Sequence, residues 1–241
     1  MPFHTLNPGK IEQTIKMLTD RIQERFPHSG LYQVCKELLA IIKVAEKRCI
    51  DISRPHVGLR IIVYISIISI ITGLLIALFS LDLPHTSILH LTEFVQVLDA
   101  SMNATVLVGA AVLFLVTVEN RLKRQRALKA IHELRAIAHV IDMHQLTKDP
   151  ERILTLNYNT TTSSPKETLN AFELTRYLDY CSEMLSLLGK IAALYGQNFD
   201  DSVVLTSAND VEILTTGLSQ KIWQKITIIH SLEKMNATDI H

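Results

Sequence analysis

The sequence predicts an all-α integral membrane protein, in which a two-span transmembrane helical hairpin carries a larger cytoplasmic helical bundle. Lysine and arginine are absent from Ile61 to Asn120, although the 241-residue chain has 24 of them. With 8 glycines and 7 prolines, the composition favours long uninterrupted helices. Outside the apolar window, hydrophobic residues recur at steps of three and four, which is the period of amphipathic helices. The window therefore predicts the membrane segments, and the periodic flanks predict the bundle.

The composition also narrows the kind of protein. Acidic and basic residues balance, with a formal net charge of +0, so no overall field attracts nucleic acid. The three cysteines, Cys35, Cys49 and Cys181, form no C-x-x-C pair, so we expect neither a disulfide framework nor a zinc site. Residues 1–30 are charged and amphipathic, which predicts no cleavable signal peptide. No cofactor-binding motif occurs, and no cofactor is expected.

Residues 1–57 are predicted to form a pair of cytoplasmic helices. Asn7 followed by Pro8 is typical of a helix start, with the asparagine as the N-cap and the proline in the first turn. Apolar residues then recur at helical spacing: Ile11, Ile15, Leu18, Ile22 and Phe26. A turn is predicted at residues 27–30, and a second amphipathic helix follows it toward the membrane.

The first transmembrane helix is predicted over residues 58–81. The stretch from Ile61 to Leu81 carries no charged side chain. At about 1.5 Å of rise per residue, it matches the ~30 Å hydrocarbon core of a bilayer. A soluble core helix seldom stays apolar on every side over such a length. Small residues at a spacing of four form a groove that lets another helix approach closely: Ser69, Gly73 and Ala77.

A short extracytoplasmic connection, residues 82–97, is predicted to lead into a second transmembrane helix over residues 98–119. The stretch from Ala100 to Val118 has no charged residue but contains the polar Asn103. It repeats the small-residue spacing: Ser101, Thr105 and Gly109. Such grooves suit packing within one hairpin or packing between subunits, and both interpretations stay open.

The distribution of basic residues predicts the orientation. Five of them precede the first span: Lys43, Lys47, Arg48, Arg54 and Arg60. Five follow the second span: Arg121, Lys123, Arg124, Arg126 and Lys129. From Asp82 to Asp99 the charged residues are all acidic: Asp82, Glu93 and Asp99. Because positive residues stay on the cytoplasmic side, both termini are predicted to be cytoplasmic, in what we take to be a bacterial inner membrane.

Polar residues line one side of the second span and the turns before it. They are Gln96, Asp99, Asn103 and Thr117. In a bilayer such residues tend to face protein or water, so this stripe is typical of a pore-lining face. A helix end at the outer membrane interface has the same pattern, because charge costs little there, and Gln96 and Asp99 are expected at that interface.

The second span is predicted to continue as a cytoplasmic helix over residues 120–147. This stretch has no proline or glycine and is rich in good helix formers. An apolar seam for a partner helix runs along it: Ala127, Ile131, Leu134, Ala138 and Ile141. Residues 148–165 are predicted to be a linker, because they include the low-complexity polar run NYNTTTSS.

Residues 166–241 are predicted to form an antiparallel helical hairpin. Ser164 and Glu167 have the spacing of a capping box. The first helix carries an unbroken heptad seam: Leu174, Leu178, Cys181, Leu185, Leu188, Ala192 and Tyr195. The second carries its own apolar positions: Val211, Leu214, Leu218, Ile222, Ile226 and Ile229. Such a hairpin cannot bury both faces alone, so we expect it to pack on the other helices or on another subunit.

One dense polar cluster lies just below the second span. Four of its members share a helix face: His132, Arg135, His139 and Asp142. His144 points elsewhere. A structural stripe is the preferred interpretation, ahead of a ligand or anion site, a metal site and a catalytic site. No metal is assigned, because Arg135 would repel a cation and three ligands on one straight helix cannot close a tetrahedral shell.

An enzyme is the least favoured interpretation, although the sequence leaves it open. The sequence has no nucleotide-binding loop, serine-hydrolase elbow or H-E-x-x-H motif. Three residues separate Arg135 from His139 and eight separate it from His144, so neither pair fits the short R-x4-6-H motif of some ribonucleases. We call the polar cluster of His132, Arg135, His139, Asp142 and His144 the histidine belt. A remaining hypothesis is that this belt gates or stiffens the juxtamembrane helix as the pH changes, because imidazoles change charge near neutral pH.

Three functions fit this organisation. The first is an oligomeric membrane protein whose second helices surround a central axis, as a candidate ion channel gated from its cytoplasmic helices. The second is a membrane-anchored scaffold or sensor that recruits a cytosolic partner through residues 166–241. The third, an enzyme using the histidine belt, has the least support. In architecture the chain resembles the two-span membrane effector domains of bacterial defence systems, which act on the membrane when triggered. The implied partners are the lipid bilayer, further copies of the chain and a cytosolic protein.

Overall fold

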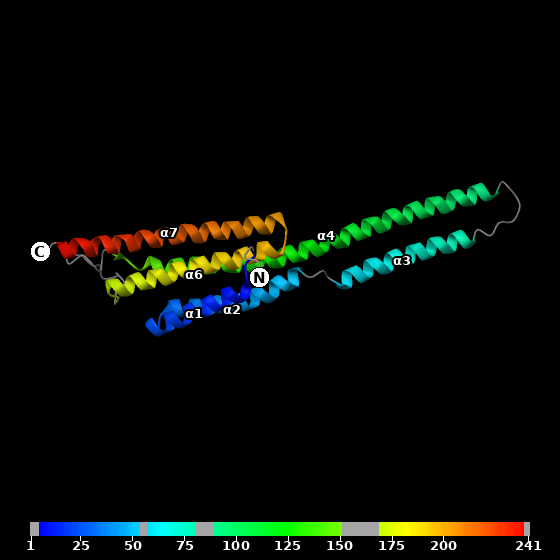
Figure 1. Cartoon of the computed structure of the whole chain (residues 1–241). Helices are drawn as coiled ribbons and strands as arrows, with labels where there is room; N and C mark the ends of the chain where they lie inside the picture. Colours follow the sequence, from blue (N-terminus) through cyan, green and yellow to red (C-terminus); the bar gives the residue numbers. More distant parts are fainter. Residues whose placement is uncertain (1–4, 54–56, 81–88, 151–168, 239–241) are drawn as a thin grey trace. The chain divides into compact units, whose positions relative to one another are not determined.

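A computed structural model describes residues 5–53, 57–80, 89–150 and 169–238 of the chain. Every regular element within these residues is a helix, which confirms the all-α prediction. In chain order they are α1 (Pro8–Arg25), α2 (Gly30–Ser53), α3 (Val57–Ser80), α4 (Leu89–Leu146), α6 (Ala171–Asn198) and α7 (Ser202–Thr238), drawn in Figure 1. The chain divides into two units, one of residues 1–53 with 126–241 and one of residues 54–125.

Side-chain caps fix where the helices of the bundle begin. The Asn7 side chain accepts a hydrogen bond from the Lys10 N–H at 3.2 Å, with proline in the first turn, as predicted. At α6 the cap is Asn170, whose side chain accepts from the Glu173 N–H at 2.8 Å, while the Glu173 carboxylate accepts from the Asn170 N–H at 2.9 Å. The capping box predicted at residues 164–167 lies outside the described residues.

The helix α4 is one continuous element of 58 residues. Its continuity through the predicted second span and into the cytoplasmic extension agrees with the sequence analysis. Its start differs, because α4 already begins at Leu89, inside the stretch 82–97 that was predicted as a connection. Residues 89–108 contain no glycine or proline, so nothing in this stretch interrupts the helix before the apolar window. Residues 81–88 lie outside the described part of the chain.

The helices α1, α2, α6, α7 and the later turns of α4 share one hydrophobic core. The predicted α4 seam is buried along its whole length, with residues exposed by 1% or less: Ala127, Ile131, Leu134, Ala138 and Ile141. The seam of α6 is equally buried, from Leu174 to Tyr195. Burying a large aliphatic side chain contributes roughly 1.5–3 kcal/mol, so the burial of these seams stabilises the bundle.

The hairpin of α6 and α7 packs against the N-terminal helices. Figure 1 shows α6 and α7 side by side, and α6 also contacts α1 and α2. The rings of Tyr177 and Tyr180 on α6 meet Phe26 edge to face, with centroids 5.6 and 6.3 Å apart. The expectation that this hairpin needs a further packing surface is therefore confirmed within a single chain.

The unit of residues 54–125 has the opposite character. Many of its described apolar side chains are exposed, among them Ile65 at 61%, Leu107 at 71% and Phe114 at 66%. Among the described residues, one helix is long and apolar enough to cross a membrane, the part of α4 from Leu98 to Leu146, and its most apolar window has no residue buried within the chain. Among the side chains of α3 that the structure describes, the continuous apolar stretch is Tyr64–Gly73, which is shorter than a full crossing. The second of the two predicted crossings is thus matched by length and composition, while the first stays a prediction.

Candidate functional site

Three members of the polar stripe of α4 form hydrogen bonds within the helix. Gln96, Asp99 and Asn103 are exposed, and the Asn103 side-chain N–H donates to an Asp99 carboxylate oxygen at 3.4 Å. The Thr117 hydroxyl donates to the Leu113 carbonyl oxygen at 2.8 Å. Hydroxyl groups bonded to the preceding turn are tolerated in an apolar medium, so Thr117 does not require water around it.

The small residues of both apolar segments face open space. A Cβ atom added to Gly73 or to Gly109 would meet no atom within 4 Å. Ser69 is also exposed, whereas the side chain of Ala77 lies outside the described residues. Among the residues that the structure describes, no other helix of the same chain therefore occupies the grooves at these glycines, which leaves them accessible to another chain.

The histidine belt is divided by its tertiary partners. His132 and His139 are exposed. Arg135 instead pairs with Asp210 on α7, with a guanidinium nitrogen 3.5 Å from a carboxylate oxygen, and Asp142 accepts a hydrogen bond from the Gln145 amide at 2.6 Å. The described residues contain no group of three or more histidine, cysteine or acidic side chains that could hold a metal ion.

His144 packs against the first residue of α2. A Cβ atom added to Gly30 would overlap the His144 ring, so the close approach of these two helix ends requires glycine at this position. Burial and the positive charge of nearby Lys148 lower the pKa of His144. Both effects favour the neutral imidazole at this contact.

A lysine of α7 closes the end of α4. The Lys225 ammonium group donates to the backbone carbonyl oxygens of Gln145 at 2.6 Å and Lys148 at 2.9 Å. The Gln145 carbonyl lies in the last turn of α4, where a cation is favoured, and it also accepts a hydrogen bond from the Lys148 N–H at 3.1 Å, whereas Lys148 lies just beyond the helix end. Burial lowers the pKa of Lys225, and Asp149 and Asp142 oppose that shift. We call this group of residues the α4–α7 junction.

Two further buried groups, Cys181 and Gln145, belong to the surroundings of the α4–α7 junction. Burial raises the pKa of Cys181 to about 12, so its thiol is protonated and unreactive near neutral pH. The Gln145 side chain is 1% exposed, and its amide oxygen has no hydrogen-bond partner among the described residues. The sequence analysis missed Lys225, because a lysine beside the apolar seam of α7 gives no signal of its distant partner.

A second polar link joins α2, α4 and α6. An Arg48 guanidinium nitrogen lies 2.8 Å from a Glu133 carboxylate oxygen, and this hydrogen bond is the main reason why the pKa of Arg48 is raised. The Tyr195 hydroxyl lies beside Arg48, and burial raises the pKa of Tyr195 to about 12. The tyrosine is therefore neutral, and the three residues act as a staple between helices.

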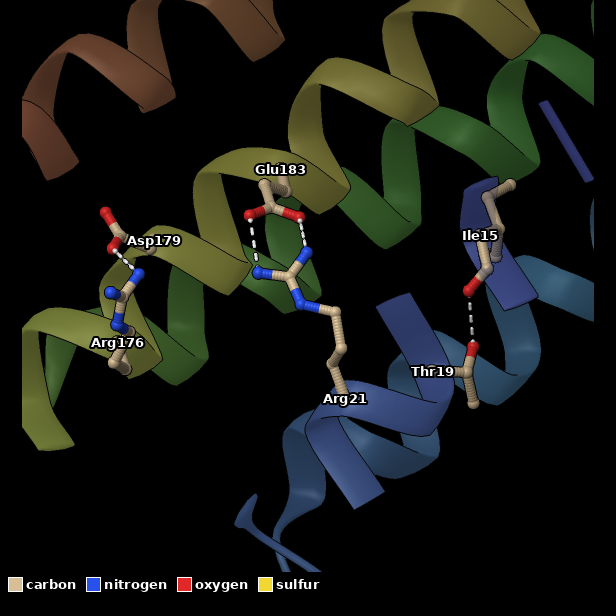
Figure 2. Close-up of polar contacts among 6 residues, drawn as sticks. All are labelled: Ile15, Thr19, Arg21, Arg176, Asp179 and Glu183. Carbon is tan, nitrogen blue, oxygen red and sulfur yellow. Dashed lines mark hydrogen bonds and ion pairs between the residues drawn. The ribbon is translucent and has the colours of Figure 1, made fainter. Parts of the chain in front are cut away.

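An arginine-rich surface lies on α1 and α6. Figure 2 shows Arg21 reaching Glu183 through two hydrogen bonds of 3.0 and 3.3 Å, and Arg176 beside Asp179 at 3.4 Å. The exposed Phe172 ring lies under the guanidinium groups of Arg25 and Arg176, with centroid distances of 5.3 and 5.7 Å. These residues, with Glu24 and Tyr180, line an open hollow of about 510 Å³. Because carboxylates pair with Arg21 and Arg176, the hollow has little excess charge with which to attract an anion.

Comparisons with known proteins give no match to this chain: no family model, no curated protein and no solved structure is significantly similar to it. The functional argument therefore depends on the residues themselves. The polar groups of the bundle that the structure describes join helices in pairs and triplets, and they do not combine a nucleophile with a base. Their arrangement is that of a helical bundle whose helices are joined by polar contacts and of which α4 is a part.

Proposed function

We propose that this protein crosses the bacterial inner membrane twice and holds its helical bundle at the cytoplasmic face as a scaffold or sensor for a cytosolic protein. The observation that carries the proposal is the dual nature of α4. Its apolar window has no residue buried within the chain, whereas its later turns contribute a fully buried seam to the bundle core. One helix is thus suited to lipid at one end and to protein at the other.

The energetics of the apolar window support a membrane location. Leu107, Leu113 and Phe114 are exposed by 71%, 70% and 66%, next to further exposed aliphatic residues. Apolar surface left in water costs about 25 cal/mol per Å², and contiguous patches of this extent are rare on soluble monomers. Lipid tails remove that cost. The basic residues on both flanks favour a cytoplasmic position for both ends of the chain.

The membrane proposal is tested by extraction and topology. In membranes washed with alkaline carbonate, the full chain should stay in the pellet. A reporter fused after residue 241 should be active only in its cytoplasmic form, and a reporter inserted between residues 82 and 88 only in its periplasmic form. Release by carbonate would refute membrane insertion, and a cytoplasmic signal from residues 82–88 would refute the two-span topology.

The proposed surface for the cytosolic partner is the outer side of α7 around Trp223. This side chain is 57% exposed and lies in a shallow hollow whose other lining residues are uncharged: Gln220, Gln224, Thr227 and Ile228. Exposed tryptophan on a surface without charge is typical of an interface centre, where such side chains dominate the binding energy. The surface lies inside residues 166–241, which the sequence analysis selected for partner binding.

Point substitutions test this surface better than truncation, because deletion of residues 166–241 would remove the α6 seam from the core. Trp223→Lys should reduce capture of the cytosolic partner by about tenfold or more, since loss of a central tryptophan typically costs about 2 kcal/mol or more. Met17→Lys is the matched control, because Met17 is 52% exposed on α1. If both variants capture the partner equally, the Trp223 surface is not its binding site.

An oligomeric pore, of the kind formed by membrane effectors, is the second candidate. It is favoured by the empty grooves at Gly73 and Gly109 and by the exposed Asp99 and Asn103 on α4. Since one chain with two spans cannot enclose a pore, the mass of the protein in mild detergent decides between the candidates. A ring of four or more copies, with a conductance that Asn103→Leu abolishes, would support the pore. A monomer would exclude it.

A further inference from the structure

The helix α4 carries a run of positive charge directly after its apolar window. The residues Arg121, Lys123, Arg124, Arg126 and Lys129 lie in a stretch, 120–132, that contains no acidic residue. Five cations so close together on one helix create a strong local field, although the whole chain has a net charge of +0. Only those that are exposed and not paired with a carboxylate can bind a partner.

These cations differ in their exposure and in whether they form an ion pair. Lys123 is only 8% exposed, and its ammonium group lies 2.7 Å from a Glu119 carboxylate oxygen, so its charge is already compensated. Arg121, Arg126 and Lys129 are exposed, and none of the three forms an ion pair with any residue that the structure describes.

The three exposed cations lie on one side of the helix. With 3.6 residues per turn, Arg121, Arg126 and Lys129 fall within a sector that also contains the exposed Leu122 and Gln125. The buried positions of the same turns, such as Ala127, Ala130 and Ile131, lie on the opposite side, against the core. We call the sector formed by Arg121, Arg126 and Lys129 the α4 cationic face.

We propose that the α4 cationic face binds the headgroups of anionic phospholipids in the cytoplasmic leaflet. This inference rests on the proposed membrane insertion of α4. At about 1.5 Å of rise per residue, Arg121 to Lys129 spans about 12 Å of helix. A headgroup layer of roughly 5–7 Å and a Debye length of about 8 Å together cover that distance. Leu122, 41% exposed beside Arg121, suits the boundary between headgroups and acyl chains.

The position of the face favours lipid over other anionic partners. The same helix exposes Leu113, Phe114 and Val116 less than three turns earlier, so the first surface that the cations meet in a membrane is its headgroup layer. Clusters of lysine and arginine at this position attract acidic lipids by about 1 kcal/mol for each residue near the surface, or about fivefold each.

The test uses the full chain reconstituted in vesicles of phosphatidylcholine and phosphatidylglycerol in equal parts, with trace spin-labelled lipid of either type. The wild-type protein should enrich phosphatidylglycerol over phosphatidylcholine at its boundary by about fivefold or more at low salt. The triple variant Arg121→Gln, Arg126→Gln, Lys129→Gln should lose most of this preference. Glutamine is a good helix former at exposed positions, so the fold is preserved.

The matched control removes the same amount of charge elsewhere in the bundle. Lys10→Gln, Lys16→Gln and Lys221→Gln change exposed lysines on α1 and α7, and this variant should keep the wild-type preference. High salt should weaken the preference, whereas soluble glycerophosphate at low concentration should leave it unchanged, because a single free headgroup lacks the multivalent membrane surface.

Several outcomes would overturn the proposal. Equal preference in the triple variant and in the control would show that the α4 cationic face does not select lipid. No preference in the wild-type protein would do the same and would leave an acidic protein as the remaining partner for these charges. Release of the protein by alkaline carbonate would refute membrane insertion as well, so a failure of the lipid surface alone is distinguishable from a failure of the proposed function.

Discussion

Replacement of Lys225 by methionine tests the α4–α7 junction most directly. Methionine keeps the length of the aliphatic stem but cannot donate to the carbonyl oxygens of Gln145 and Lys148, which lie 2.6 and 2.9 Å from the ammonium group. A hydrogen bond from a charged donor contributes about 1.5–3 kcal/mol. The Gln145 carbonyl oxygen keeps a hydrogen bond from the Lys148 N–H at 3.1 Å, so the variant does not leave this oxygen without a partner. Lys225 is partly exposed, so water replaces part of what is lost. We expect a net destabilisation of about 2 kcal/mol.

The assay is thermal unfolding of the full chain in mild detergent, followed by circular dichroism, together with hydrogen exchange of the last turn of α4. A loss of about 2 kcal/mol should lower Tm by about 4–8 °C for a bundle of this size. Exchange should accelerate mainly at the amides of residues 140–148. Lys221→Met is the control, because Lys221 is exposed on the same helix and makes no ion pair with the described residues. Equal Tm values for the two variants would refute the junction's role.

The remaining predictions concern three other contacts of the bundle. Gly30→Ala should lower stability by about 1–3 kcal/mol, because its methyl group overlaps the His144 ring, whereas Gly217→Ala, which meets nothing within 4 Å, should stabilise α7 by roughly 0.5–1 kcal/mol; thermal unfolding compares them. The pKa of His144 is lowered below 6.5, so the unfolded chain takes up its proton first, and the unfolding free energy should fall as pH drops through 6.5 until the folded group also protonates. His144→Gln should flatten this pH dependence, and an unchanged slope would contradict the assignment. A double-mutant cycle of Arg48→Met and Glu133→Gln should give a coupling of about 1 kcal/mol or less, because both side chains are about 40% exposed, at 40% and 38%.

The periodicity of the sequence was sufficient to predict which residues form the core. The seams of α4 and α6 follow from steps of three and four alone, since a helix with one apolar stripe has only one side to bury. The start of α1 was also predictable, because the N-cap Asn7 and the following proline act locally. By contrast, the start of α4 at Leu89 was not predicted, since the bounds 98–119 describe the expected membrane span and not the whole helix that contains it.

The polar contacts were far less predictable than the core. The shared face of His132, Arg135, His139 and Asp142 follows from helix geometry, yet Arg135 is directed to Asp210 while both histidines face solvent. Such partners are separated by many residues in the chain and depend on which helices become neighbours. No local pattern contains that information. The contact of Gly30 with His144 could not be predicted from the sequence for the same reason.

The contacts of its last turns determine what α4 can transmit. Near its C-terminal end, α4 contacts α2 through His144 and Gly30, and α7 through Lys225. A rotation of α4 by a single residue, about 100°, would turn the His144 ring away from Gly30 and the buried seam away from the core. Since the cost of exposing that seam greatly exceeds the ~1–3 kcal/mol of a typical allosteric coupling, a rotation of α4 within an intact bundle costs too much to carry a signal. A signal that passes along α4 must instead act on the partly exposed polar contacts at its end, which cost little to break and are the contacts that Lys225→Met and a change of pH both weaken.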